Sequence, residues 1–109
     1  VDAVAAGNRV CVKPSELMPR TAELIAALLH DALGDDVARV VVGDAAVATD
    51  FAAQSWDHLV FTGGTATGRK VAEAAARNLV PVTLELGGKC PAVVFPGADL
   101  RDAARCILA

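Results

Sequence analysis

Residues 58–89, HLVFTGGTATGRKVAEAAARNLVPVTLELGGK, decide the fold of this 109-residue chain. An apolar run ending in Thr62 is followed by two glycines, an alanine-rich stretch and a second apolar run that ends in Glu85. The pattern predicts a strand over 58–62, a helix over 65–78 and a strand over 81–85. A strand, a helix and a strand in this order indicate a βαβ unit with parallel strands.

The rest of the chain continues the same alternation. Further expected elements are strands over 9–13, 38–42 and 91–95 and helices over 19–33, 45–53 and 99–109. Gly34 is a suitable C-terminal stop for the helix over 19–33. Asp44 and Asp99 are suitable N-caps for the helices over 45–53 and 99–109. The apolar run over 40–42 is typical of a strand covered on both faces. The predicted fold class is α/β, a doubly wound parallel sheet with a Rossmann-like core.

Composition limits the size and chemistry of the core. The length allows one domain at most. Hydrophobic residues make up 54% of the chain and aromatic residues only 4%. The core is therefore expected to consist of Ala, Val and Leu, with four large side chains among them: Phe51, Trp56, Phe61 and Phe95.

Charge and cysteine usage exclude several classes of protein. The net charge of −3 comes from 10 basic and 13 acidic residues, and the basic ones are scattered, which indicates no nucleic-acid partner. No apolar run approaches the roughly 20 residues of a membrane span, and no signal-peptide pattern is present, so no membrane partner and a cytoplasmic location are expected. Cys11, Cys90 and Cys106 have no metal-binding spacing, and we expect reduced, mostly buried thiols and no metal site.

The glycine turn over 61–68 is the first candidate site. A strand ends there and a helix begins, and the free amides and positive dipole end of a helix suit a phosphate group. The spacing is G-x-T-x-x-G, which differs from the ordinary dinucleotide fingerprint. A glycine-rich turn is also an ordinary βα connection, so these residues alone leave both interpretations open.

Two further clusters follow predicted strands. Lys13 and Glu16 can bracket a ribose, with the carboxylate accepting from its hydroxyls. The alternative is a helix-capping arrangement of Ser15 or Glu16, with Lys13 solvated. Glu85, next to Gly87-Gly88, can act as a general base, or it can be an exposed acid paired with Lys89.

Taken together and in this order, the motifs resemble those of the NAD(P)-dependent aldehyde dehydrogenase superfamily. The resemblance extends almost end to end and is carried by residues 6–16, 61–68 and 84–89. The phrase ARNLVPVTLE over 76–85 is most similar to the branch of class 3 and coniferyl aldehyde dehydrogenases.

The resemblance implies roles for individual residues. Residues 1–86 would be part of the NAD(P)-binding domain, and residues 87–109 the start of the catalytic domain. Glu85 would be the general base, Lys13 and Glu16 would contact the adenosine ribose, and Leu86 and Gly87 would pass the nicotinamide. The implied cofactor is NAD, with NADP possible, and the full set of implied cofactor-binding residues is Lys13, Glu16, Gly63, Gly64, Thr65, Gly68, Leu86 and Gly87.

The resemblance also implies a reaction and its missing parts. A parent enzyme, a homodimer or homotetramer, would oxidise an aldehyde substrate to a carboxylic acid through a cysteine thioester. The nucleophilic cysteine and the oxyanion asparagine would lie outside this chain, an internal fragment expected to be inactive alone. Cys90 is assigned no nucleophilic role, because the family usually has a small residue such as Ser there, and Gly64 stands where Ser is common.

Two other functions remain open at this stage. The chain can belong to a reductase of acyl phosphates or acyl-CoA from the same superfamily, although such enzymes need no hydrolytic base and Glu85 argues against them. It can also be a nucleotide-binding module without catalytic activity.

Overall fold

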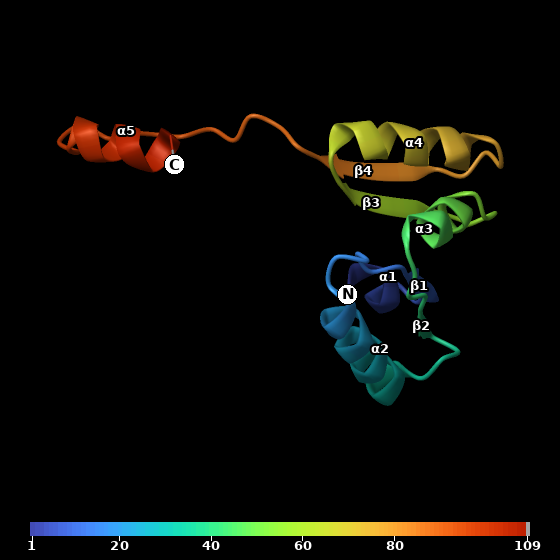
Figure 1. The fold of residues 1–109 in the computed structure, drawn as a ribbon. Helices are drawn as coiled ribbons and strands as arrows, with labels where there is room; N and C mark the ends of the chain where they lie inside the picture. Colours follow the sequence, from blue (N-terminus) through green and yellow to red (C-terminus); the bar gives the residue numbers. More distant parts are fainter. Residues whose placement is uncertain (109) are drawn as a thin grey trace.

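The computed structural model describes residues 1–108, which form five helices and four strands in alternating order (Figure 1). The elements are α1 (Asp2–Ala5), β1 (Val10–Val12), α2 (Pro19–Leu33), β2 (Ala38–Val40), α3 (Ala45–Ala52), β3 (Leu59–Gly63), α4 (Thr65–Ala76), β4 (Val82–Leu86) and α5 (Leu100–Leu108). The predicted α/β class is confirmed.

Most predicted elements are present, with ends that shift by one or two residues. The α2 helix has the predicted bounds, and Gly34 follows it with a φ of +73°. Asp99 caps α5 as predicted, since its Oδ1 accepts from the amides of Arg101 and Asp102 at 2.8 and 3.2 Å. The end of the predicted last helix, Ala109, lies outside the described residues.

The predicted strand over 91–95 is wrong. This segment belongs to no helix or strand and is exposed along its length. A strand needs a partner for its amides and carbonyls, and no other strand of residues 1–108 lies beside this segment. Its β-prone sequence is therefore extended but unpaired.

The strands pair in parallel, as predicted, but in two separate pairs. In the first pair Cys11 of β1 lies opposite Arg39 of β2, and in the second Leu59 of β3 lies opposite Val82 of β4. Within the described residues the doubly wound sheet is thus present as two two-stranded halves rather than as one continuous sheet. The expectation that the run over 40–42 is covered on both faces is wrong among the described residues: Val42 is 55% exposed, although Val40 and Val41 are half-buried.

The core lies where α3 and α4 meet β3 and β4. Its buried members are Ala52, Leu59, Ala75 and Val80. Phe51 and Trp56 pack against them with ring centroids 4.7 Å apart, and the Trp56 indole donates to the Phe51 carbonyl at 2.7 Å. These two aromatic residues belong to the core as predicted, and Phe61 is half-buried.

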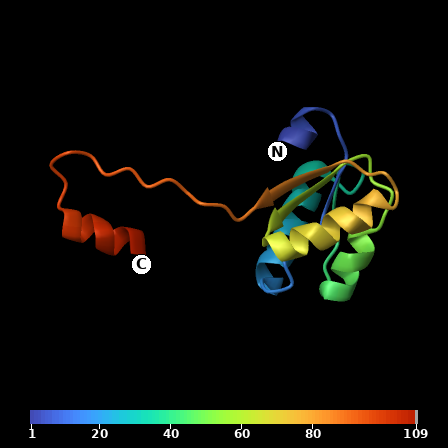
Figure 2. The ribbon, with the colours of Figure 1, turned by 90° about the horizontal axis from the view of Figure 1, so that it is seen from above.

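The C-terminal segment leaves this body after β4. Figures 1 and 2 show residues 87–99 as an extended arm that carries α5 away from the other elements. The radius of gyration is 18.4 Å, against about 13 Å for a compact domain of this length. Phe95 is consequently 74% exposed, and its predicted place in the core is wrong.

The cysteines differ in burial for the same reason. Cys90 and Cys106 lie on the arm and α5 and are exposed, so their predicted burial is wrong. Cys11 lies on β1 and is half-buried, and this burial raises the pKa of its thiol, with Arg39 acting in the opposite direction. All three thiols are free.

Candidate functional site

One large cleft brings together two of the predicted site clusters. Its volume is about 1860 Å³, and Lys13 and Glu16, which follow β1, line it together with Gly63 and Gly64 at the end of β3. Pockets for small ligands usually measure roughly 300–1,000 Å³, so this cleft has room for an extended ligand. Open α/β sheets bind ligands beyond the carboxyl ends of their strands, where these residues lie.

Lys13 and Glu16 form an ion pair at one part of this cleft. Lys13 Nζ lies 2.8 Å from Glu16 Oε2, with side chains that are 9% and 44% exposed respectively. The hydrogen bond from Lys13 is the main cause that lowers the pKa of the Glu16 carboxyl. The pair therefore presents a charged, partly exposed carboxylate held by a lysine whose side chain is largely covered.

The alternative interpretation of this segment as a helix cap is wrong. The N-cap of α2 is Met18, and no side chain caps that helix. Ser15 Oγ instead accepts from the amide of Leu17 at 3.3 Å, within the turn itself. Lys13 is not solvated, so its charge is directed to Glu16.

The glycine turn between β3 and α4 is open to the cleft. Gly64 is the N-cap of α4, with φ −70° and ψ 146°, and no side chain caps this helix. A Cβ at Gly64 would meet no atom within 4 Å, whereas one at Gly63 would lie 2.7 Å from the Phe61 ring. The first amides of a helix have no partner within the helix. This end of α4, which begins at Thr65, can therefore donate to an anion.

Gly68 sets the distance between α4 and β4. It is buried, and a Cβ there would lie 2.5 Å from Leu86 Cδ2. The Leu86 side chain thus packs under α4 at Gly68, and a larger residue there would require it to shift. Five predicted site residues are not part of the cleft lining among residues 1–108: Thr65, Gly68, Glu85, Leu86 and Gly87.

Glu85 lies near the end of β4 on the face that points away from α4. It is exposed and opposite Thr62 of β3 in the parallel register. No ion pair joins it to Lys89 within residues 1–108, so the pairing that the sequence allowed does not form there. The carboxylate is accordingly available to solvent.

Thr62 is a residue that sequence reasoning did not single out. It lines the cleft and lies on the same face as Glu85. On the same face, Thr83 of β4 lies two residues before Glu85. Its Oγ1 is 2.9 Å from Nε2 of His58, the residue before β3. On β4 the alternation of Thr83 and Glu85 with apolar residues could have identified their shared face, whereas on β3 Val60 lies on the same face as Thr62.

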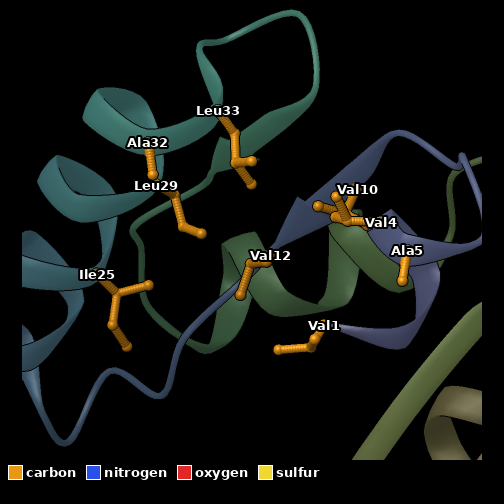
Figure 3. A pocket seen from close by; sticks show the side chains of 9 residues that line it. All are labelled: Val1, Val4, Ala5, Val10, Val12, Ile25, Leu29, Ala32 and Leu33. Carbon is orange, nitrogen blue, oxygen red and sulfur yellow. The ribbon is translucent and has the colours of Figure 1, made fainter.

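The described residues show neither a metal centre nor a membrane span. No group of three or more potential ligands gathers in residues 1–108, and none of their helices combines the length and apolarity needed to cross a bilayer. A second hollow of about 580 Å³ lies between α1, β1 and α2, and its lining is entirely apolar (Figure 3). It offers no groups for chemistry.

Comparison with known proteins identifies relatives over the whole chain. The sequence model of the aldehyde dehydrogenase family matches residues 1–109. A coniferyl aldehyde dehydrogenase of Pseudomonas sp. is 53% identical over 104 residues, which cover 95% of this chain and 22% of that protein. Aldehyde dehydrogenase family 3 member I1 of Arabidopsis thaliana is 47% identical over 109 residues, covering 100% of this chain and 20% of that protein.

Solved structures of aldehyde dehydrogenases also match this chain. Aldehyde dehydrogenase C from Pseudomonas syringae, determined as a mutant with NAD+ and octanal, superposes with a TM-score of 0.79 at 43% identity. The match covers 93% of this chain and 21% of that one. The chain therefore spans about a fifth of the length of these relatives. The resemblance drawn from the motifs, including its branch, is confirmed.

Proposed function

Since the chain belongs to the aldehyde dehydrogenase family, we propose that the complete protein oxidises an aldehyde to a carboxylic acid with NAD+. The observation that carries this proposal is the shared cleft, in which the Lys13–Glu16 pair and the Gly63-Gly64 turn face one space. A ribose needs hydrogen-bond acceptors, which Glu16 would supply. A pyrophosphate needs hydrogen-bond donors, which the turn at Gly63-Gly64 would supply at a separate place in the cleft.

The cofactor-binding residues divide by the part of the dinucleotide that they would hold. Lys13 and Glu16 would bind the adenosine ribose, and Gly63, Gly64 and Thr65 would bring the amides of α4 to the pyrophosphate. Gly68 would act through packing, because it lets α4 lie directly against Leu86. The backbone at Leu86 and Gly87 would pass the nicotinamide, where the absence of a side chain at Gly87 leaves space.

Glu16 also bears on the choice between NAD+ and NADP+. Its lowered pKa keeps the carboxylate charged at neutral pH, and a carboxylate beside the ribose repels a 2′-phosphate. We therefore propose a preference for NAD+. The ratio of kcat/KM for the two cofactors tests this, and a Glu16→Gln variant should narrow that ratio.

Glu85 would serve as the general base. Its exposed carboxylate at a strand end is accessible to a water molecule, which it would activate to hydrolyse the thioester. The nucleophilic cysteine would be supplied by a part of the protein outside this chain, and Cys90 would not replace it. The cofactor, when bound, would supply the hydride acceptor.

The relatives suggest a substrate class. Coniferyl aldehyde, named in one relative, is aromatic, and octanal, bound in a solved one, is a medium-chain aldehyde. We propose an aldehyde of one of these two kinds, a domain boundary after Leu86, and a homodimer or homotetramer. Kinetics with both aldehydes and the mass of the complete protein in solution test these points.

The deciding experiment uses the complete natural protein. It should reduce NAD+ only when an aldehyde is present and should release the carboxylic acid. Glu85→Gln should slow acid release by roughly 10²–10⁴-fold, the usual contribution of a positioned general base. Glu73→Gln, a matched change of an exposed glutamate on α4, should leave the rate unchanged. Absence of aldehyde-dependent NAD+ reduction in the wild type would refute the proposal, and full acid release by Glu85→Gln would refute the role of Glu85 as the general base.

A further inference from the structure

Building on the proposed function, we propose that Thr62 is a positioning residue for Glu85. The Thr62 hydroxyl would donate a hydrogen bond to the carboxylate and orient it toward the water that it activates. Thr62 itself would touch neither the water nor the acyl group. The inference rests on the strand register and on the exposed face that β3 and β4 share.

The register makes Thr62 the direct cross-strand neighbour of Glu85. Neighbouring strands lie about 4.8 Å apart, and residues opposite each other in a pleated sheet point to the same face. Both side chains are exposed, whereas Phe61 and Leu84, one position earlier, are half-buried on the α4 side. Thr62 and Glu85 therefore extend side by side from the uncovered face.

The same face already contains one cross-strand polar contact. His58 Nε2 and Thr83 Oγ1 are within hydrogen-bond distance, at 2.9 Å. Thr83, two residues before Glu85 on β4, is thus engaged by His58. Thr62 is the hydroxyl in register with Glu85, and it also lines the cleft.

An exposed glutamate needs such a neighbour to act as a base. Three side-chain torsions let its carboxylate sample many orientations, and holding it in one of them costs conformational entropy. A hydroxyl fixed on the adjacent strand can hold the carboxylate through a bond to a charged acceptor. In the structure the two residues are registered neighbours, and the bond would form when the carboxylate turns toward the water.

The test compares variants of the complete protein that differ in the hydroxyl. Thr62→Val keeps the β-branched shape and removes the donor, whereas Thr62→Ser keeps the donor. Thr62→Val should slow acyl-enzyme hydrolysis about tenfold, the scale of one hydrogen bond to a charged group. It should also raise the pKa of the acidic limb of the pH–rate profile, because the charged carboxylate loses a donor. Thr62→Ser should restore both.

Two controls separate positioning from other roles. The Kd for NAD+, measured by calorimetry, should change less than about twofold in Thr62→Val, since one lost contact of a bound ligand would cost more. Thr83→Val removes the neighbouring hydroxyl of the same face and should not move the acidic limb. Thr62→Ala provides a second variant without the hydroxyl if Thr62→Val unfolds.

Each outcome decides the question. In the first, Thr62→Val hydrolyses the acyl-enzyme at the wild-type rate with an unchanged acidic limb, while hydrolysis is blocked in Glu85→Gln. That result would overturn this inference and leave the proposed function standing. A weakened Kd for NAD+ with an unmoved limb would also overturn it and assign Thr62 to cofactor binding. Unimpaired hydrolysis in Glu85→Gln would overturn the role of the base and this inference together.

Discussion

The two consecutive strand-to-helix turns of this chain, β2 to α3 and β3 to α4, are built from similar residues and end differently. In the first, Asp44 Oδ1 accepts from the amides of Ala46 and Val47 at 3.0 and 3.1 Å. A Cβ at Gly43 would lie 2.5 Å from Val47 Cβ, so the turn is packed against its own helix. In the second, Gly64 has no side chain to cap α4 and borders open space.

The difference shows how one local motif can serve either stability or binding. The α3 turn satisfies its helix amides internally, and such a cap contributes about 1 kcal/mol. The α4 turn forgoes that contribution, because no side chain caps the helix, and Gly64 lines the cleft. A ligand that supplies an anion there replaces the missing cap. Four changes, from the largest expected effect to the smallest, test this division.

Gly64→Asp should convert the α4 turn into a copy of the α3 turn. The new carboxylate should cap α4 and repel the phosphates of NAD+, weakening its Kd about 100-fold, while the free energy of unfolding rises by about 1 kcal/mol. Calorimetry and denaturant unfolding of the complete protein measure the two quantities. Gly64→Ser, a neutral cap, should give the gain in stability without the loss of binding. Equal NAD+ affinity in Gly64→Asp would mean that no phosphate approaches this turn.

Gly43→Ala should destabilise the packed turn by about 1–3 kcal/mol, because the added methyl group has no space beside Val47. Gly64→Ala changes the N-cap of the α4 turn, where an added Cβ meets no atom within 4 Å, and its cost should stay near 0.5 kcal/mol, since only cap preference is lost. Denaturant midpoints of both variants provide the comparison. Similar losses in the two variants would show that the turns do not differ in packing.

Asp44→Ala should lower the free energy of unfolding by about 1 kcal/mol through loss of the α3 cap. Asp44→Asn retains the accepting oxygen and should behave as the wild type. NAD+ affinity should stay unchanged in both, because this turn keeps its amides for its own helix. A marked loss of NAD+ binding in Asp44→Ala would contradict the separation of the two roles.

The smallest effect concerns the opposite kind of helix end, at the C-terminus of α2. His30 Nδ1 lies 2.9 Å from Asp35 Oδ1, and this partner raises the pKa of His30 and lowers that of Asp35. The raised pKa stabilises the fold below pH 6.5, and the gain is lost as pH rises through the folded-state pKa of His30. The Asp35 contribution is present above pH 3.8 and is lost as pH falls through its folded-state pKa.

Because both groups are exposed, the resulting change should be small. Unfolding of the wild type and of His30→Gln at about pH 5 and pH 8 should show a difference only at the lower pH. A difference of equal size at both values would mean that the pair contributes through packing rather than charge.

The sequence was informative wherever hydrogen bonds close within a few residues. The bounds of α2, the Asp44 and Asp99 caps and the glycine turn before α4 follow from neighbours along the chain. The family resemblance likewise rested on motifs that can be read locally. Element ends were less certain because terminal turns fray and are settled by packing.

Errors arose where a residue depended on a distant partner. The β-prone segment over 91–95 found no strand beside it, and Phe95, Cys90 and Cys106 are exposed because they lie on the arm or on α5 rather than on the body. Composition could identify these side chains as suited to a core. It could not determine whether a core would reach them.

The sequence by itself determined the order of helices and strands and the family. Only the tertiary structure decided that Lys13 pairs with Glu16, that Gly68 makes room for Leu86, and that Thr62 lies opposite Glu85. Propensity, capping and turn chemistry act between residues close along the chain. Burial and register depend on segments brought together from many residues away, and no local pattern encodes that approach.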